Sequence, residues 1–361
     1  MFRRKKKRII VPGAGSGGQN NLIRDIRAAR NDIYIVGTNM DKFSLLLSNA
    51  DKNYLLPPAK DKNYVEELNA LIERERIDAL VPGGDREVRA VSENREKINA
   101  PILLPQKETI RLCQDKYLLN QHLAKHGVRV AHSVPIKDAD DALRKFNEVQ
   151  KEGIVWCRVR NSSGSMGSLP VKSAEHAKFW IEYWRDMRNV NPDRFMLCEY
   201  LPGRDYAFQS LWYDGELIIA KACERLEYFF AKNMPSGSSS TPKVARPISD
   251  KKVIDTCIEA VNCVDDHPNG IFSIDLKENK EGEPCVTEIN VGRFCMITPI
   301  FDLTGKYNMA DIYLRLIFGE KVEIKNMVSD IDENVYLIRD LDVLPCISQK
   351  ASPFRAGMNA V

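Results

Sequence analysis

The first hundred residues alternate between short apolar runs and longer stretches in which apolar side chains recur at helical spacing. The apolar runs predict strands at 8–11, 32–36, 79–81 and 102–104. The stretches of helical spacing predict helices at 21–30, 66–75 and 86–98. Strands and helices that alternate in this way form a parallel sheet with helices on both faces. We therefore expect an α/β domain over about residues 1–107.

From Asp115 the pattern changes, and no internal repeat is visible. Helices are predicted at 116–125, 139–150 and 174–186. Strands are predicted near 132–135 and at 155–159, 195–200, 205–213, 216–223 and 335–338. The chain of 361 residues is thus long enough for two or three domains.

Two runs of alternating pattern, Ile271–Leu276 and Cys285–Asn290, are joined by a Gly-containing segment and predict a β-hairpin. Residues two apart in a strand share a face, so Glu288 and Asn290 point the same way, and Asp275 on the partner strand can join them. Two carboxylates and an amide oxygen form an all-oxygen ligand set that suits Mg²⁺. The alternative is a solvated hairpin with charged residues on its outer face.

A loop of small residues at 162–168 lets backbone amides approach phosphate oxygens closely. Its central residues are Ser163, Gly164 and Ser165. Arg158 on the preceding strand and Lys116 at a helix start can supply positive charge to a polyphosphate, although each alone could be a surface salt-bridge partner. Arg293, just after the hairpin, offers a forked donor to an oxyanion. A second polar loop at 236–241 is either another lid or a hairpin tip.

The glycines near the N-terminus match the dinucleotide pattern Gly13-x-Gly15-x-x-Gly18. NAD recognition would also need an acid at the end of the second strand, but the first acid, Asp41, lies farther on. We therefore interpret the glycines as a tight turn that lets a helix pack closely against a strand.

Composition excludes several classes of protein. Apolar residues make up 43% and charged residues 29%, with no apolar run of membrane-spanning length. The net charge of +3 is not typical of a nucleic-acid-binding protein, and the basic run at 3–8 is interpreted as a solvated lead-in to the first strand. Nine scattered cysteines without a Cys-x-x-Cys pair, and no signal peptide, predict reduced thiols and a cytoplasmic location.

Taken together, these parts resemble the ATP-grasp superfamily, most closely carbamoyl-phosphate synthetase large chains and carboxylate–amine ligases. The motifs that carry the resemblance are Val81-Pro82-Gly83-Gly84-Asp85, Gln114-Asp115-Lys116, Cys198-Glu199-Tyr200-Leu201-Pro202-Gly203-Arg204-Asp205 and Glu224-Arg225-Leu226-Glu227. The resemblance implies a Rossmann-like pre-ATP-grasp domain, α/β, followed by an α+β ATP-grasp fold of two subdomains. The implied ranges are 1–107, 108–320 (with subdomains 108–197 and 198–320) and a C-terminal extension at 321–361.

The resemblance also implies roles for individual residues. Lys116, Arg158 and the loop around Ser163, Gly164 and Ser165 would bind the phosphates of ATP. Backbone groups near Cys198, Glu199 and Leu201 would form hydrogen bonds with the adenine. Asp205 would accept hydrogen bonds from the ribose hydroxyls. Arg225 would lie near the triphosphate and Arg293 near the acceptor carboxylate, as catalytic residues. Asp275, Glu288 and Asn290 would bind Mg²⁺, and Asp85, Tyr228 and Thr298 are plausible lining residues of the substrate site.

The chain departs from the family pattern in three places. Arg158-Val159 stands where the family has Lys-Pro, and Ser162 replaces a common loop glycine. Asn290-Val291-Gly292-Arg293 replaces Asn-Pro-Arg, so we expect Arg293 to be slightly displaced. The chain holds one grasp module and no glutaminase, so we do not expect it to make carbamoyl phosphate as the complete synthetase does.

The expected function is an ATP- and Mg²⁺-dependent ligase that activates a carboxylate as an acyl phosphate and joins it to an amine, releasing ADP and phosphate. One alternative is a carbamoyl-phosphate-synthetase-like kinase or phosphotransferase activity. Another is a nucleotide-binding regulator without turnover. The expected partners are small-molecule carboxylates and amines, with neither nucleic acid nor membrane, and a homodimer is left open.

Overall fold

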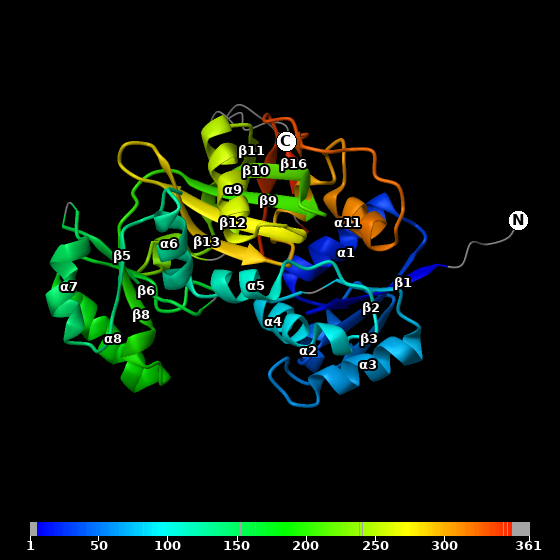
Figure 1. Ribbon diagram of the computed structural model, residues 1–361, viewed down its shortest axis with the longest axis horizontal. Coiled ribbons are helices and arrows are strands. Elements are labelled where there is room, and N and C mark those ends of the chain that lie inside the picture. Colours follow the sequence, from blue (N-terminus) through cyan, green and yellow to red (C-terminus); the bar gives the residue numbers. More distant parts are fainter. Residues whose placement is uncertain are drawn as a thin grey trace, which may run out of the picture.

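The computed structural model describes residues 6–348 except positions 82, 152, 163, 238, 240, 342 and 345, and it gives only the backbone of 346–348. Three β-sheets and the helices packed against them make up the molecule (Figure 1). The predicted mixture of a parallel α/β part and an α+β part is confirmed.

The first sheet is parallel and lies at the N-terminal end of the chain. Its strands are, in spatial order, β3 (Lys52–Leu55), β2 (Ile33–Asn39), β1 (Lys7–Pro12) and β4 (Ala79–Leu80). Its helices are α1 (Gly17–Ala29), α2 (Lys42–Leu46), α3 (Tyr64–Glu75), α4 (Asp85–Glu93) and a 3-10 turn, Arg95–Lys97. Ile9 and Val11 pack on the α1 face of the sheet and Ile10 on the α3 face, because neighbouring residues of a strand point to opposite sides.

The predicted strand at 102–104 is wrong. Leu104 is buried and Ile102 and Leu103 are half-buried, but the carbonyls in and just before this segment accept isolated hydrogen bonds instead of forming a ladder. Leu80 N donates to the Pro101 carbonyl at 3.0 Å, and the Tyr313 hydroxyl donates to the Leu103 carbonyl at 3.0 Å. The edge strand β3 and helix α5 (Lys107–Cys113) were not predicted.

The second sheet is antiparallel and belongs to the lobe at the left of Figure 1. Its strands are, in spatial order, β5 (Ser133–Pro135), β8 (Phe195–Glu199), β6 (Val155–Val159) and β7 (Leu169–Val171). Its helices are α6 (Lys116–Lys125), α7 (Asp141–Val149), α8 (Ala174–Arg188) and a 3-10 turn, Pro192–Arg194. The predicted subdomain boundary at residue 197 falls inside strand β8. The boundaries at 107, 197 and 320 stay predictions.

Alternation along β6 decides which of its side chains face the helices. Val155, Cys157 and Val159 are buried with residues of α7 and α8 in one core cluster. Trp156 and Arg158 therefore point to the opposite face of the sheet. The strand thus places a cation on the side away from its own helices.

The third and largest sheet runs through the middle of the molecule (Figure 1). Its main path is β13 (Pro284–Val291), β12 (Gly270–Glu278), β9 (Asp205–Tyr213), β10 (Glu216–Tyr228), β11 (Pro242–Ile248), β15 (Tyr336–Ile338) and β16 (Cys346–Ser348). Strand β14 (Met327–Val328) pairs with β10. The remaining elements are α9 (Lys251–Val264), α10 (Thr298–Phe301), α11 (Met309–Ile317) and a 3-10 turn, Ala231–Asn233.

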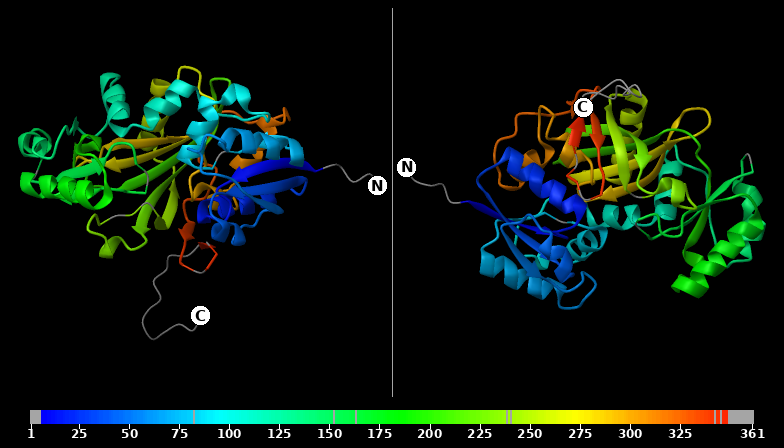
Figure 2. Two further views of the ribbon diagram at one scale, coloured as in Figure 1. Left: turned by 90° about the horizontal axis from the view of Figure 1, so that it is seen from below. Right: turned by 180° about the vertical axis from the view of Figure 1, so that it is seen from behind.

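Residues beyond 320 are part of this sheet, since β14 pairs with β10 and β15 pairs with β11. Helix α11, just before them, shares a core cluster with β1 and α1 of the first sheet. In the view from behind, this orange helix lies beside the dark blue N-terminal elements (Figure 2). The C-terminal part of the chain thereby binds the large sheet to the first one.

The glycine turn after β1 has a structural reason at Gly15. Its φ is +91°, in the region that favours glycine, and a Cβ there would lie 1.7 Å from the Ser44 carbonyl oxygen. Asp41 accepts hydrogen bonds from Phe43 N and Ser44 N and so caps α2. The close approach of the turn to α2 therefore excludes any side chain at Gly15.

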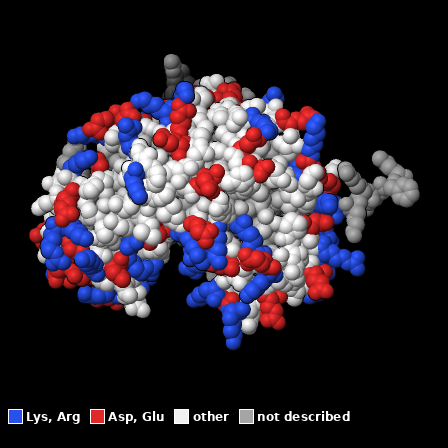
Figure 3. All heavy atoms as spheres, in the orientation of Figure 1, with Lys and Arg blue, Asp and Glu red and all other residues white. Residues whose placement is uncertain are grey.

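Between the lobe of α7 and α8 and the part around α2 and α3, the surface in Figure 3 is deeply hollowed. Lys and Arg side chains lie along both walls of this hollow. Elsewhere on this face, acidic and basic residues are interspersed.

Candidate active site

A cavity of about 490 Å³ lies where the second and third sheets face each other. Every described residue that was predicted to bind ATP or Mg²⁺ or to act in catalysis lines it. These residues are Lys116, Arg158, Gly164, Ser165, Cys198, Glu199, Leu201, Asp205, Arg225, Asp275, Glu288, Asn290 and Arg293. Of the three predicted substrate-lining residues, Tyr228 lines this cavity too, whereas Asp85 lines a different cavity and Thr298 lines neither. Ser163 lies outside the described residues. Positions from 116 to 293 thus converge on one cavity.

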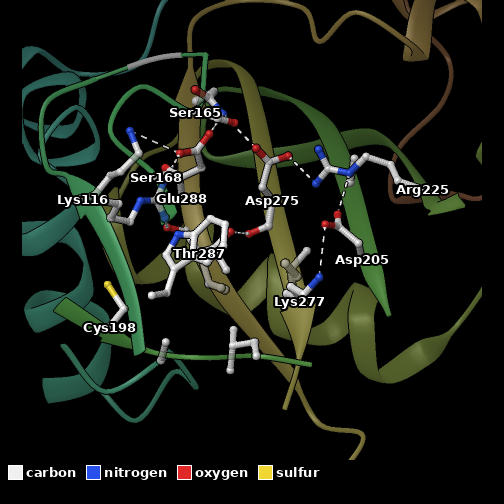
Figure 4. Close-up of a pocket in the computed structure, with 18 of the residues that line it drawn as sticks. Lys116, Ser165, Ser168, Cys198, Asp205, Arg225, Asp275, Lys277, Thr287 and Glu288 are labelled. Atoms are coloured by element: carbon white, nitrogen blue, oxygen red, sulfur yellow. Dashed lines mark hydrogen bonds and ion pairs between the residues drawn. The ribbon is translucent and has the colours of Figure 1, made fainter. Parts of the chain in front are cut away.

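The predicted acidic set sits on the hairpin of β12 and β13 (Figure 4). The strand register places Asp275 opposite Glu288. Asn290 Nδ2 lies 3.3 Å from Glu288 Oε1 and 3.5 Å from Asp275 Oδ2. The register shifts just after Asp275, and the Thr287 hydroxyl donates to the Asp275 carbonyl at 2.9 Å. This bulge turns the two carboxylates toward each other in the cavity.

Two cations hold the Glu288 carboxylate. Arg158 Nη2 lies 2.9 Å and Lys116 Nζ 3.3 Å from Glu288 Oε2. Burial alone would raise the pKa of Glu288, but Lys116 and Arg158 outweigh it and hold the pKa well below its usual range. Glu288 is therefore ionised at neutral pH, and its two cations come from strand β6 of the second sheet and from the start of helix α6.

A third cation, Arg225, forms ion pairs with the other two acids of the site, Asp275 and Asp205. Arg225 Nη2 donates to Asp275 Oδ1 at 2.9 Å, and Arg225 Nε lies 2.8 Å from Asp205 Oδ1. Burial raises the pKa of Asp275, Arg225 opposes that rise, and Glu288 adds to it. Lys277, which was not predicted, lies 4.0 Å from Asp205. Asp205, predicted to meet a ribose, is thus paired with cations in this structure.

The residues present fit a hard divalent cation. Asp275 and Glu288 present carboxylate oxygens on one face of the hairpin, which is the chemistry that Mg²⁺ prefers. Asn290 turns its Nδ2 toward these carboxylates and its Oδ1 toward Arg293, so its amide would have to rotate to offer a metal its oxygen. Burial is the main cause of the raised pKa of Asp275, and repulsion from Glu288 adds to it; a divalent cation between the two carboxylates would remove that repulsion. Three side-chain cations already compensate the acids, so a metal would displace or share these contacts.

Arg293 connects the acidic set to the first domain. Its Nη2 donates to Asn290 Oδ1 at 2.8 Å, and its Nε donates to Asp85 at the start of α4. The sequence placed both residues near the substrate but did not predict their pairing, because 208 positions separate them. The replaced Asn-Pro-Arg motif therefore still brings its arginine to the ligand set.

Lys116 is positioned by the end of its helix. Asp115 caps α6 by accepting from Tyr117 N and Leu118 N, and it pairs with Arg160 Nη2 at 2.9 Å. Lys116 Nζ also donates to the Ser162 carbonyl. Arg160 was missed as a positioning residue; its place just before the small-residue loop was the available signal.

Cys198, Glu199 and Leu201 lie at the end of β8, where the chain leaves the second sheet. Cys198 and Leu201 are buried, and the Glu199 carboxylate lies 2.8 Å from Lys151 Nζ. Glu199 N donates to the His132 carbonyl at 2.8 Å. The segment from Cys198 to Leu201 thus lines the cavity where the chain leaves the sheet. The eight cysteines with described side chains form no disulfide.

Comparison with known proteins agrees with this architecture. Residues 10–102 match the family model described as PylC-like, N-terminal domain. Phosphoribosylaminoimidazole carboxylase of Saccharomyces cerevisiae is 49% identical over 39 residues, and that of Candida albicans is 32% identical over 102 residues. These matches span 11% and 28% of the chain but only 7% and 18% of those relatives.

Solved structures are similar over nearly the whole chain. An L-amino acid ligase from Bacillus licheniformis has a TM-score of 0.68 at 12% identity, over 93% of this chain and 79% of the other. The biotin carboxylase domain of a Hydrogenobacter thermophilus 2-oxoglutarate carboxylase, a dimer with MgADP, ADP and bicarbonate, has a TM-score of 0.68 at 17% identity, over 93% and 74%. The chain therefore has the fold of ATP-grasp proteins, as the sequence motifs predicted. Among the described residues, no helix is both long and apolar enough to cross a membrane.

Proposed function

We propose that the chain is an ATP- and Mg²⁺-dependent ligase that activates a carboxylate as an acyl phosphate and joins it to an amine, releasing ADP and phosphate. The observation that carries the proposal is the pairing of the acids on the hairpin with cations from both sheets inside one cavity. The similar fold of an amino acid ligase and a biotin carboxylase supports it.

The cations of the cavity provide the triphosphate site. Lys116 and Arg158 hold Glu288 here and can exchange its carboxylate for phosphate oxygens when nucleotide and metal enter together. Mg²⁺ on Asp275, Glu288 and Asn290 supplies charge that neutralises the phosphates when it is bound. Backbone amides of Gly164 and Ser165 line the same cavity and can donate to the phosphates.

The remaining cavity residues provide the nucleoside site. Cys198, Glu199 and Leu201 are proposed to read the adenine edge through the backbone at the end of β8. Asp205 is proposed to accept from the ribose hydroxyls, which requires that it loosen its pairing with Arg225.

The proposed reaction has two steps. A carboxylate oxygen of the substrate bonds to the γ-phosphorus, and the bond to the bridging oxygen breaks, so that ADP leaves. The amine then bonds to the acyl carbon, loses a proton, and displaces phosphate. Arg225 and Arg293 would stabilise the negative charge that develops on the transferred phosphoryl and acyl oxygens. A closed site would keep water from the acyl phosphate.

The direct test is to screen carboxylate–amine pairs with the full chain, ATP and Mg²⁺, measuring ADP release and identifying products by mass spectrometry. We expect ADP and phosphate to form only when both substrates are present. AMP and pyrophosphate as main products would reject the mechanism, because adenylation cleaves ATP between the α- and β-phosphates.

A second candidate is a carboxylase-like activity in which bicarbonate takes the place of the organic carboxylate. The similar biotin carboxylase structure, which contains bicarbonate, is the observation that favours it. Bicarbonate-dependent ADP release without an amine would select this candidate. ATP binding without any turnover across the panel would instead select a nucleotide-binding regulator.

A further inference from the structure

A second cavity, of about 420 Å³, lies in the first domain at the carboxyl ends of the parallel strands. The strand order β3-β2-β1-β4 reverses direction between β1 and β4, and Gly13 and Gly83, which follow these two strands, both line the cavity. Ligands of open parallel sheets bind at such switch points. The cavity is therefore placed where this kind of sheet holds a small molecule.

One wall of this cavity is apolar. It is formed by Met40 after β2 and by the segment that follows β3, namely Leu56, Pro57, Pro58 and Ala59. None of these side chains can bind a polar group. The wall therefore suits the aliphatic stem of a ligand.

Two oxygen atoms at the cavity are available to a donor. Tyr64 is only 2% exposed, and no described residue bonds its hydroxyl. Glu87 uses Oε2 to accept from Gly84 N at 2.9 Å, and no described residue donates to Oε1. Both residues line the cavity, and the charge of Glu87 raises the pKa of Tyr64 in addition to the larger effect of burial. A ligand with several protons on one atom, such as an ammonium group, can bridge them.

The second cavity meets the first one at Arg293, which lines both. Its Nε and Nη2 are taken by Asp85 and Asn290, but no described residue accepts from its Nη1. A free guanidinium N–H at the junction can donate to a carboxylate. The two ends of one ligand would thus meet opposite charges.

We propose that the second cavity binds an aliphatic amino carboxylate, with its ammonium group between Glu87 and Tyr64, its stem on the apolar wall, and its carboxylate at Arg293. This rests on the proposed function and names the class of the carboxylate that is activated. The carboxylate end would face the cavity in which ATP is proposed to bind. The ammonium end, held as a charge, serves recognition and leaves the attacking amine to come from the second substrate.

The test is isothermal titration calorimetry of the full chain without ATP, at about pH 8, where the carboxyl of Glu87 is ionised. The probes are 5-aminopentanoate, 2-aminopentanoate and pentanoate. At least one amino form should bind about tenfold or more tightly than pentanoate, since hydrogen bonds to charged groups contribute about 1.5–3 kcal/mol. Equal binding of all three, or no binding of any, would overturn the proposal.

Three variants then locate the ammonium. Glu87→Gln keeps the acceptor for Gly84 N and with it the helix cap, but it should lose about tenfold in affinity for the preferred amino form and none for pentanoate. Tyr64→Phe should lose about threefold. Lys62→Ala, an exposed residue nearby in the sequence that does not line the cavity, is the matched control and should change neither affinity. An amino preference that survives Glu87→Gln would reject the assignment.

The outcome is separable from the proposed function. Binding is measured without nucleotide, so the calorimetry does not require turnover. Glu288→Gln should abolish ADP release but leave the preference for the amino form unchanged. If the amino form binds as described while no pair of substrates releases ADP, the ligase reaction fails and the binding site stands. If ADP is released but Glu87→Gln changes neither binding nor turnover, the ligase stands and this site fails.

Discussion

Two clusters of acids around basic side chains, both among the described residues, differ in whether they open to a cavity. In the hairpin cluster, Asp275 and Glu288 have side chains 26% and 23% exposed, and both line the large cavity. In the second cluster, Lys221 contacts Asp302 and Asp330, whose side chains are 0% and 2% exposed. The difference indicates that burial of charge alone does not mark a functional site, whereas burial beside open space does.

The closed cluster connects four parts of the chain. Lys221 lies on β10, Asp302 follows α10 and Asp330 follows β14. Asp25 on α1 adds a third acid, and Asn308 donates to it. Burial raises the pKa of both Asp25 and Asp302, while Lys221 opposes the rise. The described residues of this cluster line neither cavity, so we assign it to holding the first sheet, the large sheet and the C-terminal part together.

The largest expected effect separates the two clusters through activity. Glu288→Gln removes a carboxylate charge from the proposed metal site and should lower kcat/KM for ADP release about a thousandfold, since a bound metal contributes several kcal/mol to the transition state. Unfolding in urea should shift by less than about 1 kcal/mol, because Lys116 and Arg158 keep other partners. The control is Glu281→Gln, an exposed residue of the same hairpin. Turnover that is equal in both variants would remove Glu288 from the site.

The reverse pattern is expected in the closed cluster. Lys221→Met leaves Asp302 and Asp330 buried without their cation, and should lower the free energy of unfolding by about 3–5 kcal/mol. The residual folded protein should keep its affinity for ATP. Urea denaturation checks the first point and calorimetry the second, with Lys251→Met, which has a side chain 85% exposed, as control. A variant as stable as the control would show that the cluster contributes nothing to the fold.

A smaller effect is expected where the acidic set meets the first domain. Arg293→Lys keeps the charge but cannot donate to Asp85 and Asn290 from one planar group, so kcat should fall about ten- to a hundredfold. The matched control is Arg111→Lys, because the guanidinium of Arg111 donates two hydrogen bonds to the Glu93 carboxylate on the surface. Steady-state ADP release measures both. If the two variants lower kcat to the same extent, the paired hydrogen bonds of the Arg293 guanidinium have no part in turnover.

The smallest effect concerns Glu87 and pH. Burial raises the pKa of Glu87 from 4.5 to about 7, so the folded protein binds this proton more tightly than the unfolded chain does. The stability that results is fully present below about pH 4.5 and is lost as the pH rises through about 7. Glu87→Gln should therefore gain about 1–3 kcal/mol over the wild type between about pH 5 and pH 8. Urea denaturation at both values checks this, and a gain independent of pH would contradict it.

Sequence reasoning succeeded where the pattern was local. The hairpin was predictable because alternation over two adjacent runs fixes which side chains share a face, and the pairing of Asp275 with Glu288 followed from it. Helix α6 was predicted with its observed bounds, and Asp115 gives it a capped start. The prediction of a strand at 102–104 failed because a short apolar run has the same sequence pattern whether or not it pairs with another strand.

The rest depended on contacts between distant parts of the chain. The pairing of Arg293 with Asp85 spans 208 positions, and nothing near either residue indicates the other. Lys221 stands in an otherwise apolar strand, and its acids come from segments about 80 and 109 residues farther on, which only the folded chain brings together. The second cavity is likewise a product of strand order, which periodicity does not report.

Arg293 lines both cavities, and this position has a thermodynamic consequence. A ligand in the second cavity that changed the contacts of Arg293 would also change the surroundings of Asn290, and with them the affinity of the proposed site for metal and nucleotide. The free energy that couples two sites is reciprocal. If one ligand changes the affinity for the other by some factor, the second ligand changes the affinity for the first by the same factor. Through this one side chain, a ligand bound in either cavity would thus change the affinity of the other cavity for its own ligand.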